Sequence, residues 1–446
     1  MTDQSATDDQ GAPRLTTREA AELLGVKPET VYAYVSRGQL SSARAAGGRG
    51  STFDADEVRA LARRSGRRDA SPAGSDLAFR TGITLIENDH CYFRGVDATE
   101  LARRYSYEEV AEWLWTGEPR PGARFTAAAG TLAAARRTVG ALPAHSGSTD
   151  RLRVAVTAAA ATDPLRFDLS PEAVLCSARS LIPTLVGALP TLGGPDADGG
   201  SLARELWSRL TAEPADAPSL AVLNAALALL IDHDLAASTL AARVAASARA
   251  HPYAVVSAGL GVLEGPLHGA ASGLAHRMLR EAVDRGSAVP VVADHLRTGR
   301  RVPGLGHRLY RGEDPRATAL FALLEDVPQA AGALAAAREV VGTTARHAPL
   351  HANIDLALAV LSVSRGMPAD AGETVFAVSR TAGWIAHALE EYGERPLRIR
   401  PSGQYTGPRP PQPLPALRTT PRSCPQSLVW PAAPGTRSRG VAEMPE

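Results

Sequence analysis

Apolar residues recur every three or four positions along most of the chain, which is the spacing of one face of an α-helix. Such stretches run almost without interruption from about Leu77 to Tyr392, with short breaks rich in glycine and proline. Examples are YSYEEVAEWLW, SLAVLNAALALLI, STLAARVAASARA and ETVFAVSRTAGWIAHALEEY. Alanine and leucine dominate them, whereas aromatic residues make up only 5% of the 446 residues. The pattern therefore predicts a mainly α-helical body and disfavours an all-β fold.

A shorter pattern of three helices precedes this body. Thr16 and Glu19 fit a capping box at the start of a helix that ends at Gly25. Pro28 suits the first position of a second helix, which runs to about residue 37. The segment AAGGRGSTF then predicts a hairpin, and Asp54 begins a third helix.

This order of elements, spanning residues 14–64, resembles the small winged helix–turn–helix domains of MerR-like regulators and excisionases. Between Arg14 and Arg68 the chain has 11 basic and six acidic residues, a local excess of five positive charges on a protein whose net charge is +1. Such an excess suits contact with DNA phosphates. The expected recognition helix, PETVYAYVSR, has no Arg or Asn near its start, so a module for packing or dimerisation stays an alternative.

The remaining segments are predicted from composition. We expect a disordered N-terminus at 1–13, a linker at 65–78 and a disordered, proline-rich tail at 409–446. The three cysteines form no CxxC pair, which excludes a disulfide framework and a structural zinc site. No signal-peptide pattern and no run of about 18 apolar residues occurs, so we expect a cytoplasmic protein without membrane contact.

Three of the 11 histidines lie in irregular segments rich in other chemistry. His233 separates two helical patterns in LIDHDLAAST, and His268 lies in GPLHGAA just before another. His307 lies in PGLGHRLYRGEDPRA, where Gly304 and Gly306 let a ligand approach the backbone closely. Each alone would suit a structural histidine at a helix end, but the three together favour a site.

Charged residues in apolar surroundings add to this candidate site. Asp355 begins the apolar helix of HANIDLALAVLS, where burial would raise its pKa toward that of a useful general base. The alternative role, capping the helix, is open to Asp355 and to Asn353. Arg380 lies among apolar residues in FAVSRTAGWIAH and needs an anionic partner there. His347 and His351 have the spacing of zinc ligands, but a proline lies between them, and we expect no metal.

The order of these motifs resembles that of the citrate synthase family. DHxxxAST, GPLHG, GxGHRxYxxxDPRA, N-[IV]-D, RTxGWIAH and RPxxxYTG follow one another over about residues 79–408 with that family's spacing. The segment GITLIENDHCYFRG resembles the family's opening hairpin. The resemblance implies a mainly α, two-domain body, with a large helical domain at 79–268 and 363–408. A small mobile domain at 269–362 would close over the substrates.

The resemblance also implies an activity. Citrate synthases are acyltransferases that condense acetyl-CoA with oxaloacetate and water to give citrate and CoA, through an enolate and a citryl-CoA thioester, with no metal or other cofactor. In this sequence Asp355 would be the general base and His268 would stabilise the enolate. His307 would polarise the oxaloacetate ketone and supply its proton.

Oxaloacetate has two carboxylates, which suit arginine side chains. The resemblance assigns its binding to His233, Arg316, Arg380 and Arg400. Arg400 would come from the second subunit, so the resemblance implies a homodimer with shared sites.

Departures from the family leave the substrate and the activity open. The residues after Asp355 are Leu-Ala-Leu-Ala, where the family often has an aromatic residue followed by Tyr and Ser. Propionyl-CoA, giving 2-methylcitrate, is one alternative substrate, because one methylene changes binding by only about 1–3 kcal/mol. Two different functions also fit the sequence: a DNA-binding regulator whose synthase body senses oxaloacetate or CoA esters, and an inactive partner of another synthase.

Overall fold

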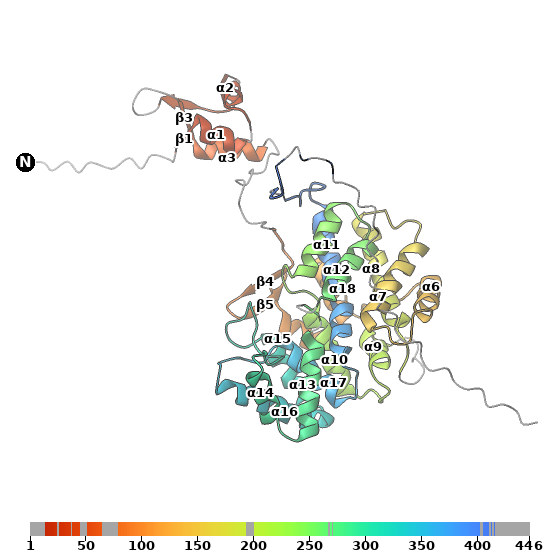
Figure 1. Ribbon diagram of the computed structural model, residues 1–446. Coiled ribbons are helices and arrows are strands. Elements are labelled where there is room, and N and C mark those ends of the chain that lie inside the picture. The colour runs from red at the N-terminus through yellow and green to blue at the C-terminus, as the bar shows by residue number, and fades with distance from the viewer. Residues whose placement is uncertain are drawn as a thin grey trace, which may run out of the picture. The chain divides into compact units, whose positions relative to one another are not determined.

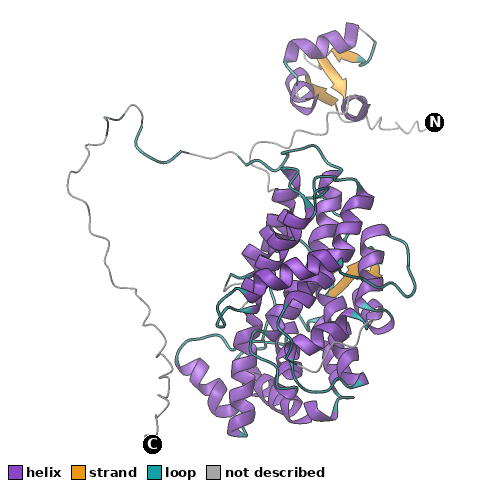
Figure 2. Ribbon diagram, turned by 90° about the vertical axis from the view of Figure 1, so that its right-hand side faces the viewer, coloured by secondary structure: helices purple, strands orange, loops and turns teal. Residues whose placement is uncertain are grey.

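The computed structural model describes residues 14–24, 26–36, 38–44, 51–64, 79–192, 200–265, 268–269, 271–401, 405–409, 412 and 414. The chain divides into two units, Met1–Pro396 and Leu397–Glu446. The expected disordered N-terminus at 1–13, the linker at 65–78 and most of the tail after residue 409 lie outside the described residues. Helices dominate the part of the chain that is described, as the sequence predicts (Figures 1 and 2).

Within 14–64, the residues that the structure describes form three short strands and three helices. The strands β1 (Arg14–Thr16), β2 (Ser42–Arg44) and β3 (Ser51–Asp54) make an antiparallel sheet in the order β1–β3–β2. The helices are α1 (Thr17–Leu24), α2 (Pro28–Ser36) and α3 (Ala55–Arg64). Strand β1 is absent from the sequence prediction because its three residues are too few to show an alternating pattern.

The helix-capping residues predicted for this segment form the expected hydrogen bonds. The backbone N–H of Thr16 donates to the Glu19 carboxylate at 2.8 Å, which confirms the capping box. The Asp54 carboxylate accepts the N–H of Asp56 at 2.9 Å and so caps α3. Eight buried apolar residues make a hydrophobic core for this segment: Ala20, Ala21, Leu24, Val31, Leu40, Phe53, Val58 and Leu61.

The predicted hairpin at the start of the body is confirmed. Strands β4 (Thr84–Glu87), β5 (His90–Phe93) and β6 (Val96–Asp97) form an antiparallel sheet in that order. Asn88 and Asp89 connect the first two strands, and both have positive φ angles, 50° and 59°. A two-residue turn of this kind matches the twist of the flanking strands, and Asn and Asp tolerate it better than most residues.

The rest of the body is helical. Its first half contains α4 (Ala98–Arg104), α5 (Tyr107–Thr116), α6 (Ala129–Gly140), α7 (Ser148–Thr162), α8 (Pro171–Ala188), α9 (Leu202–Leu210), α10 (Ala217–Leu230), α11 (Ala237–Ser247) and α12 (Pro252–Leu263). Its second half contains α13 (Ala271–Arg285), α14 (Val289–Arg297), α15 (Pro315–Leu324), a short 3₁₀ turn (Pro328–Ala330), α16 (Ala331–Ala345), α17 (Ile354–Ser364) and α18 (Ala371–Tyr392).

Helix α18 is buried along most of its length and packs against α8, α10, α11, α12 and α13 (Figure 1). Its Trp384 lies directly against Gly259 of α12, where a Cβ atom would be 2.5 Å from the indole ring. Helices α13, α15 and α16 pack around α17. Among the described residues no single helix has the length and apolar character to cross a membrane, and one bent pair, Pro315–Leu324 with Pro328–Ala345, meets the criteria of length and composition alone.

Candidate active site

The segments 304–306 and 351–353 pair their backbones, and this pairing brings His307 close to Asp355. The N–H of Gly306 donates to the carbonyl of His351 at 2.8 Å, and the N–H of Asn353 donates to the carbonyl of Gly304 at 2.9 Å. Gly304 has a φ of +79°, and a Cβ atom there would overlap the first turn of α17. Glycine is therefore required at this approach. The pairing places His307 beside the N-terminus of α17.

Asp355 lies in the first turn of α17. The Asn353 side chain, and not that of Asp355, caps the helix, because the Asn353 amide oxygen accepts the Asp355 N–H at 3.0 Å. The Asp355 carboxylate instead accepts a hydrogen bond from the hydroxyl of Ser272 at the start of α13. Burial raises the pKa of Asp355, while the Ser272 hydrogen bond and the charge of Arg316 oppose that rise. A carboxylate with a raised pKa suits proton abstraction from carbon.

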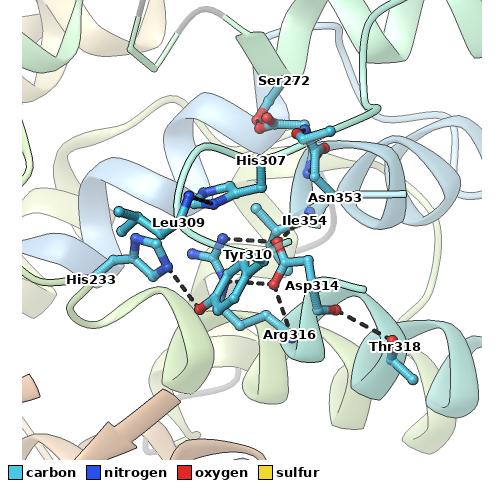
Figure 3. A network of polar contacts seen from close by, with 12 residues as sticks. His233, Ser272, His307, Leu309, Tyr310, Asp314, Arg316, Thr318, Asn353 and Ile354 are labelled. Atoms are coloured by element: carbon cyan, nitrogen blue, oxygen red, sulfur yellow. Dashed lines mark hydrogen bonds and ion pairs between the residues drawn. The ribbon is translucent and has the colours of Figure 1, made fainter. Parts of the chain in front are cut away.

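His307 belongs to a cluster of rings with His233 and Tyr310 (Figure 3). The centroids of His307 and His233 are 5.1 Å apart, and those of His307 and Tyr310 are 4.8 Å apart. The N–H of Leu309 donates to His307 Nδ1 at 3.1 Å, so in the neutral ring the proton is on Nε2. Burial, aided by the charge of Arg316, lowers the pKa of His307 to about 4. His307 is therefore a neutral hydrogen-bond donor at pH 7.

His233 is buried between the same groups. Its Nε2 lies 2.9 Å from the hydroxyl of Tyr310, a residue that sequence reasoning left without a role although it falls within GxGHRxY. Burial lowers the pKa of His233 well below its ordinary value, and the charges of Arg316 and Arg380 lower it further.

Arg316, in the first turn of α15, forms a buried ion pair with Asp314. Its Nη2 lies 2.8 Å from Asp314 Oδ2, and its Nε donates to Asp314 Oδ1 at 3.0 Å. Asp314 Oδ2 also accepts the N–H of Ile354 at 3.1 Å, which connects α15 to α17. Asp314 holds the Arg316 guanidinium in place and was not among the predicted site residues.

Arg380 is completely buried on α18, as the sequence indicates. Its Nε donates to the carbonyl of Leu230 at 2.8 Å, and its guanidinium lies 4.6 Å from the ring centre of Phe376. Within the described part of the chain, its Nη1 and Nη2 atoms have no hydrogen-bond partner. Burial lowers its pKa to about 10, although the charge of Asp232 acts in the opposite direction. A buried cation with two unused donor groups suits the binding of an anion.

His268 also lies near Phe376, with the two rings 6.0 Å apart in an edge-to-face arrangement. The His268 Nε2 is 2.8 Å from the hydroxyl of the buried Ser238, at the start of α11. Burial, followed by the charge of Arg380, lowers the pKa of His268 to about 4. This imidazole is also neutral at pH 7 and has one N–H to donate.

The predicted residues therefore fall into two groups that influence each other electrostatically. The positive charges of Arg316 and Arg380 act on His233, and that of Arg316 also acts on His307. The side chains of His268 and Asp355 are hydrogen-bonded to Ser238 and Ser272, respectively. Arg400 is exposed and lies in the second unit, Leu397–Glu446, so its assigned role stays a prediction. Among the described residues, no group of three or more His, Cys, Asp or Glu side chains is arranged to hold a metal ion.

Comparison with known families identifies the family of each part of the chain. The model of the citrate synthase C-terminal domain matches residues 75–402. The chain belongs to the citrate synthase family. A second model, of a helix-turn-helix domain, matches residues 14–66. The resemblance inferred from the sequence motifs is thus confirmed for both parts of the chain.

Individual relatives and structures support the assignment. Citrate synthase from Haloferax volcanii is 34% identical over 74% of this chain and 94% of its own length. A 2-methylcitrate synthase from Shewanella oneidensis is 25% identical over 72% of this chain and 90% of its own length. The crystal structure of citrate synthase from Pyrobaculum aerophilum, 26% identical, superposes with a TM-score of 0.65 over 84% of this chain and 97% of that one. The body thus has the fold of a citrate synthase.

Proposed function

We propose that this protein is an acyltransferase that condenses acetyl-CoA with oxaloacetate and water to give citrate and CoA. The observation that carries this proposal is the buried Arg380, whose two unpartnered nitrogen atoms lie near neutral His233. Oxaloacetate supplies a carboxylate for such a guanidinium and a ketone for a neutral imidazole donor. Arg316 provides a second positive charge in the same region.

Asp355 would remove a proton from the methyl group of acetyl-CoA. Its raised pKa improves its strength as a base, and a positioned base contributes roughly 10²–10⁴-fold to the rate. The developing enolate oxygen needs a donor, and the neutral His268 supplies one. A donor of this kind is worth about 3–4 kcal/mol in the transition state.

The enolate carbon would then attack the ketone carbon of oxaloacetate. His307 donates from Nε2 to the ketone oxygen and transfers that proton as the new carbon–carbon bond forms. Its Nδ1 accepts a hydrogen bond from the Leu309 N–H. The neutral ring is therefore protonated at Nε2, and only Nε2 can donate. Water finally cleaves the citryl-CoA thioester and releases CoA.

Two features of the assembly belong to the same proposal. The segment 269–362 would act as a small mobile domain that closes over the substrates, with 79–268 and 363–408 as the large domain, and Arg400 would reach oxaloacetate from a second subunit. Helix α11 supports a dimer, because Leu240 and Val244 on it are 38% and 45% exposed. A second subunit packed on this face of α11 would remove both side chains from water.

The choice of acyl-CoA is the finer part of the proposal. Acetyl-CoA is favoured because the Haloferax relative, at 34% identity, is a citrate synthase, and the citrate-forming reaction would be EC 2.3.3.16. Propionyl-CoA is the alternative, since a 2-methylcitrate synthase is also a relative. The aromatic residue that the family often has after Asp355 is replaced by Leu356, and this departure is compatible with the larger acyl group.

The test follows thiol release by the purified full-length protein with oxaloacetate and either acetyl-CoA or propionyl-CoA. Asp355→Asn should abolish turnover while oxaloacetate still raises the melting temperature, and Asp284→Asn, at an exposed position on α13, serves as the matched control. Absence of turnover with both acyl-CoAs, despite oxaloacetate binding, would refute the enzyme and favour a metabolite sensor. The ratio of kcat/KM for the two acyl-CoAs identifies the product.

A second function is supported by residues 14–64. They contain their own hydrophobic core, match a helix-turn-helix model and have the local positive charge that DNA contact needs. On α2 the side chain of Tyr32 is 48% exposed and so accessible for contact with a groove of the DNA duplex. Selection from random duplexes with the full-length protein tests this function, and Tyr32→Ala should reduce the enrichment of any selected sequence. Equal retention of all sequences at every salt concentration would contradict it.

A further inference from the structure

Asp89, in the turn of the β4–β5 hairpin, forms hydrogen bonds to the segment 307–316, which carries much of the candidate site. Asp89 Oδ1 accepts the backbone N–H of Arg311 at 2.7 Å, and its Oδ2 accepts the N–H of Gly312 at 3.0 Å. These partners are 222 and 223 residues away in the sequence. One carboxylate therefore binds two successive amides of a distant segment, an arrangement in which both bonds are charge-assisted.

The local backbone is shaped for this contact on both sides. Asp89 has a φ of +59°, in the hairpin turn, and is only half-buried. On the other side, a Cβ atom at Gly312 would lie 3.1 Å from Asp89 Oδ2. Any other residue at 312 would thus press on the carboxylate. Two adjacent N–H groups presented together form a concave site for an anion, and Asp89 occupies it.

The segment held by Asp89 has site residues on either side. Tyr310, which contacts both His233 and His307, directly precedes Arg311. Asp314 and Arg316, which form the buried ion pair, follow within four residues of Gly312. Asp89 therefore fixes the middle of a stretch from His307 to Arg316, in which the side chains of Tyr310, Asp314 and Arg316 are buried.

We propose that Asp89 is a positioning residue that holds the segment 307–316 in the conformation that binds oxaloacetate. The hairpin belongs to the part of the chain assigned to the large domain, and the segment belongs to the small one, so the contact acts as a clamp between them. This kinetic role rests on the proposed synthase function. The clamp itself is a property of the fold, which can be measured without turnover.

The first experiment compares Asp89→Ala, Asp89→Asn and the control Glu87→Ala, an exposed carboxylate on the same hairpin. Hydrogen exchange of the full-length protein should be faster in the peptide spanning 307–316 for Asp89→Ala and unchanged there for Glu87→Ala. We expect the KM for oxaloacetate to rise roughly tenfold, with a smaller fall in kcat, because two hydrogen bonds to a charged group are lost. Asp89→Asn keeps one acceptor oxygen and should give intermediate values.

A second experiment uses Gly312→Ala, alone and combined with Asp89→Ala. The added methyl group should raise the KM for oxaloacetate in the protein with Asp89 and have little further effect once the carboxylate is removed. Unchanged exchange over 307–316 in Asp89→Ala, or equal effects of Gly312→Ala in both backgrounds, would overturn the clamp. If the unsubstituted protein shows no turnover, the synthase proposal fails, and the exchange measurement still decides the clamp.

Discussion

The Ser272 hydroxyl donates a hydrogen bond to the Asp355 carboxylate and so joins the first turn of α13 to the first turn of α17. The contact affects a group whose pKa is already raised by burial. A hydrogen bond to the charged form of a carboxyl lowers its pKa. Ser272 therefore limits how far burial raises the pKa of Asp355, and it also orients the carboxylate.

Replacing Ser272 should shift the pH dependence of the reaction. The base must be deprotonated, so activity falls as the pH drops through the pKa of Asp355. Ser272→Ala removes the donor, raises that pKa further and moves the acid limb of kcat to higher pH. Ser272→Thr, which keeps the hydroxyl, should restore the limb. An unchanged limb in Ser272→Ala would show that another group controls it.

Sequence reasoning predicted the parts of the site that depend on short motifs. The helices, the hairpin, and the placement of His307, Asp355 and Arg380 in the same site all follow from local pattern and family spacing. The partners of these residues did not follow, because Ser272 and Asp355 are 83 positions apart and meet only through the packing of two helices. Asp89 was missed for the same reason, since an aspartate in a hairpin turn gives no local sign of a distant partner.

Arg380 should be needed for substrate binding much more than for folding. Arg380→Leu loses the bond to the Leu230 carbonyl but also removes a buried charge with two unpartnered groups, so the free energy of unfolding should change by no more than about 1 kcal/mol. Oxaloacetate affinity should fall at least roughly 100-fold, since a carboxylate loses charge-assisted bonds worth about 1.5–3 kcal/mol each. Calorimetric titration and urea unfolding measure the two effects.

A second buried arginine provides the contrast for this prediction. Arg243 forms ion pairs with Glu390 at 2.7 Å and with Glu391 at 3.2 Å. Arg243→Leu leaves Glu391 buried without its cation and should destabilise the protein by about 3–5 kcal/mol. Similar losses of stability in both variants would contradict the view that Arg380 is reserved for an anion.

The partly buried His268 and His307 should make stability depend on pH. His268 and His307 have pKa values of about 4 in the folded protein, against about 6.5 when unfolded. Between these values the unfolded chain binds more protons, so the free energy of unfolding falls as the pH drops from about 6.5 toward 4. His307→Gln should show a weaker fall between pH 7 and 5 in urea unfolding, whereas the exposed His145→Gln should follow the unsubstituted protein.

Gly383 should be irreplaceable because α18 approaches the segment before His233 very closely. A Cβ atom at Gly383 would overlap the carbonyl oxygen of Ile231 and lie 3.0 Å from Asp232 Oδ1. Gly383→Ala should therefore lower the melting temperature and weaken oxaloacetate binding by displacing His233. Gly332→Ala on α16, where nothing lies within 4 Å, should instead be neutral or stabilising by up to about 1 kcal/mol. Equal behaviour of the two variants would refute the close-approach argument.

The assignment of Arg400 to a partner's site predicts complementation between two inactive proteins. Arg400→Ala and Asp355→Ala should each be inactive alone. In a mixed dimer, one site combines the intact Asp355 of the first variant with the intact Arg400 of the second. After unfolding and refolding together, about half of the dimers are mixed and each has one complete site, so roughly a quarter of full activity should return. No recovery, in a mixture shown by mass to contain mixed dimers, would place Arg400 in its own subunit's site or outside any site.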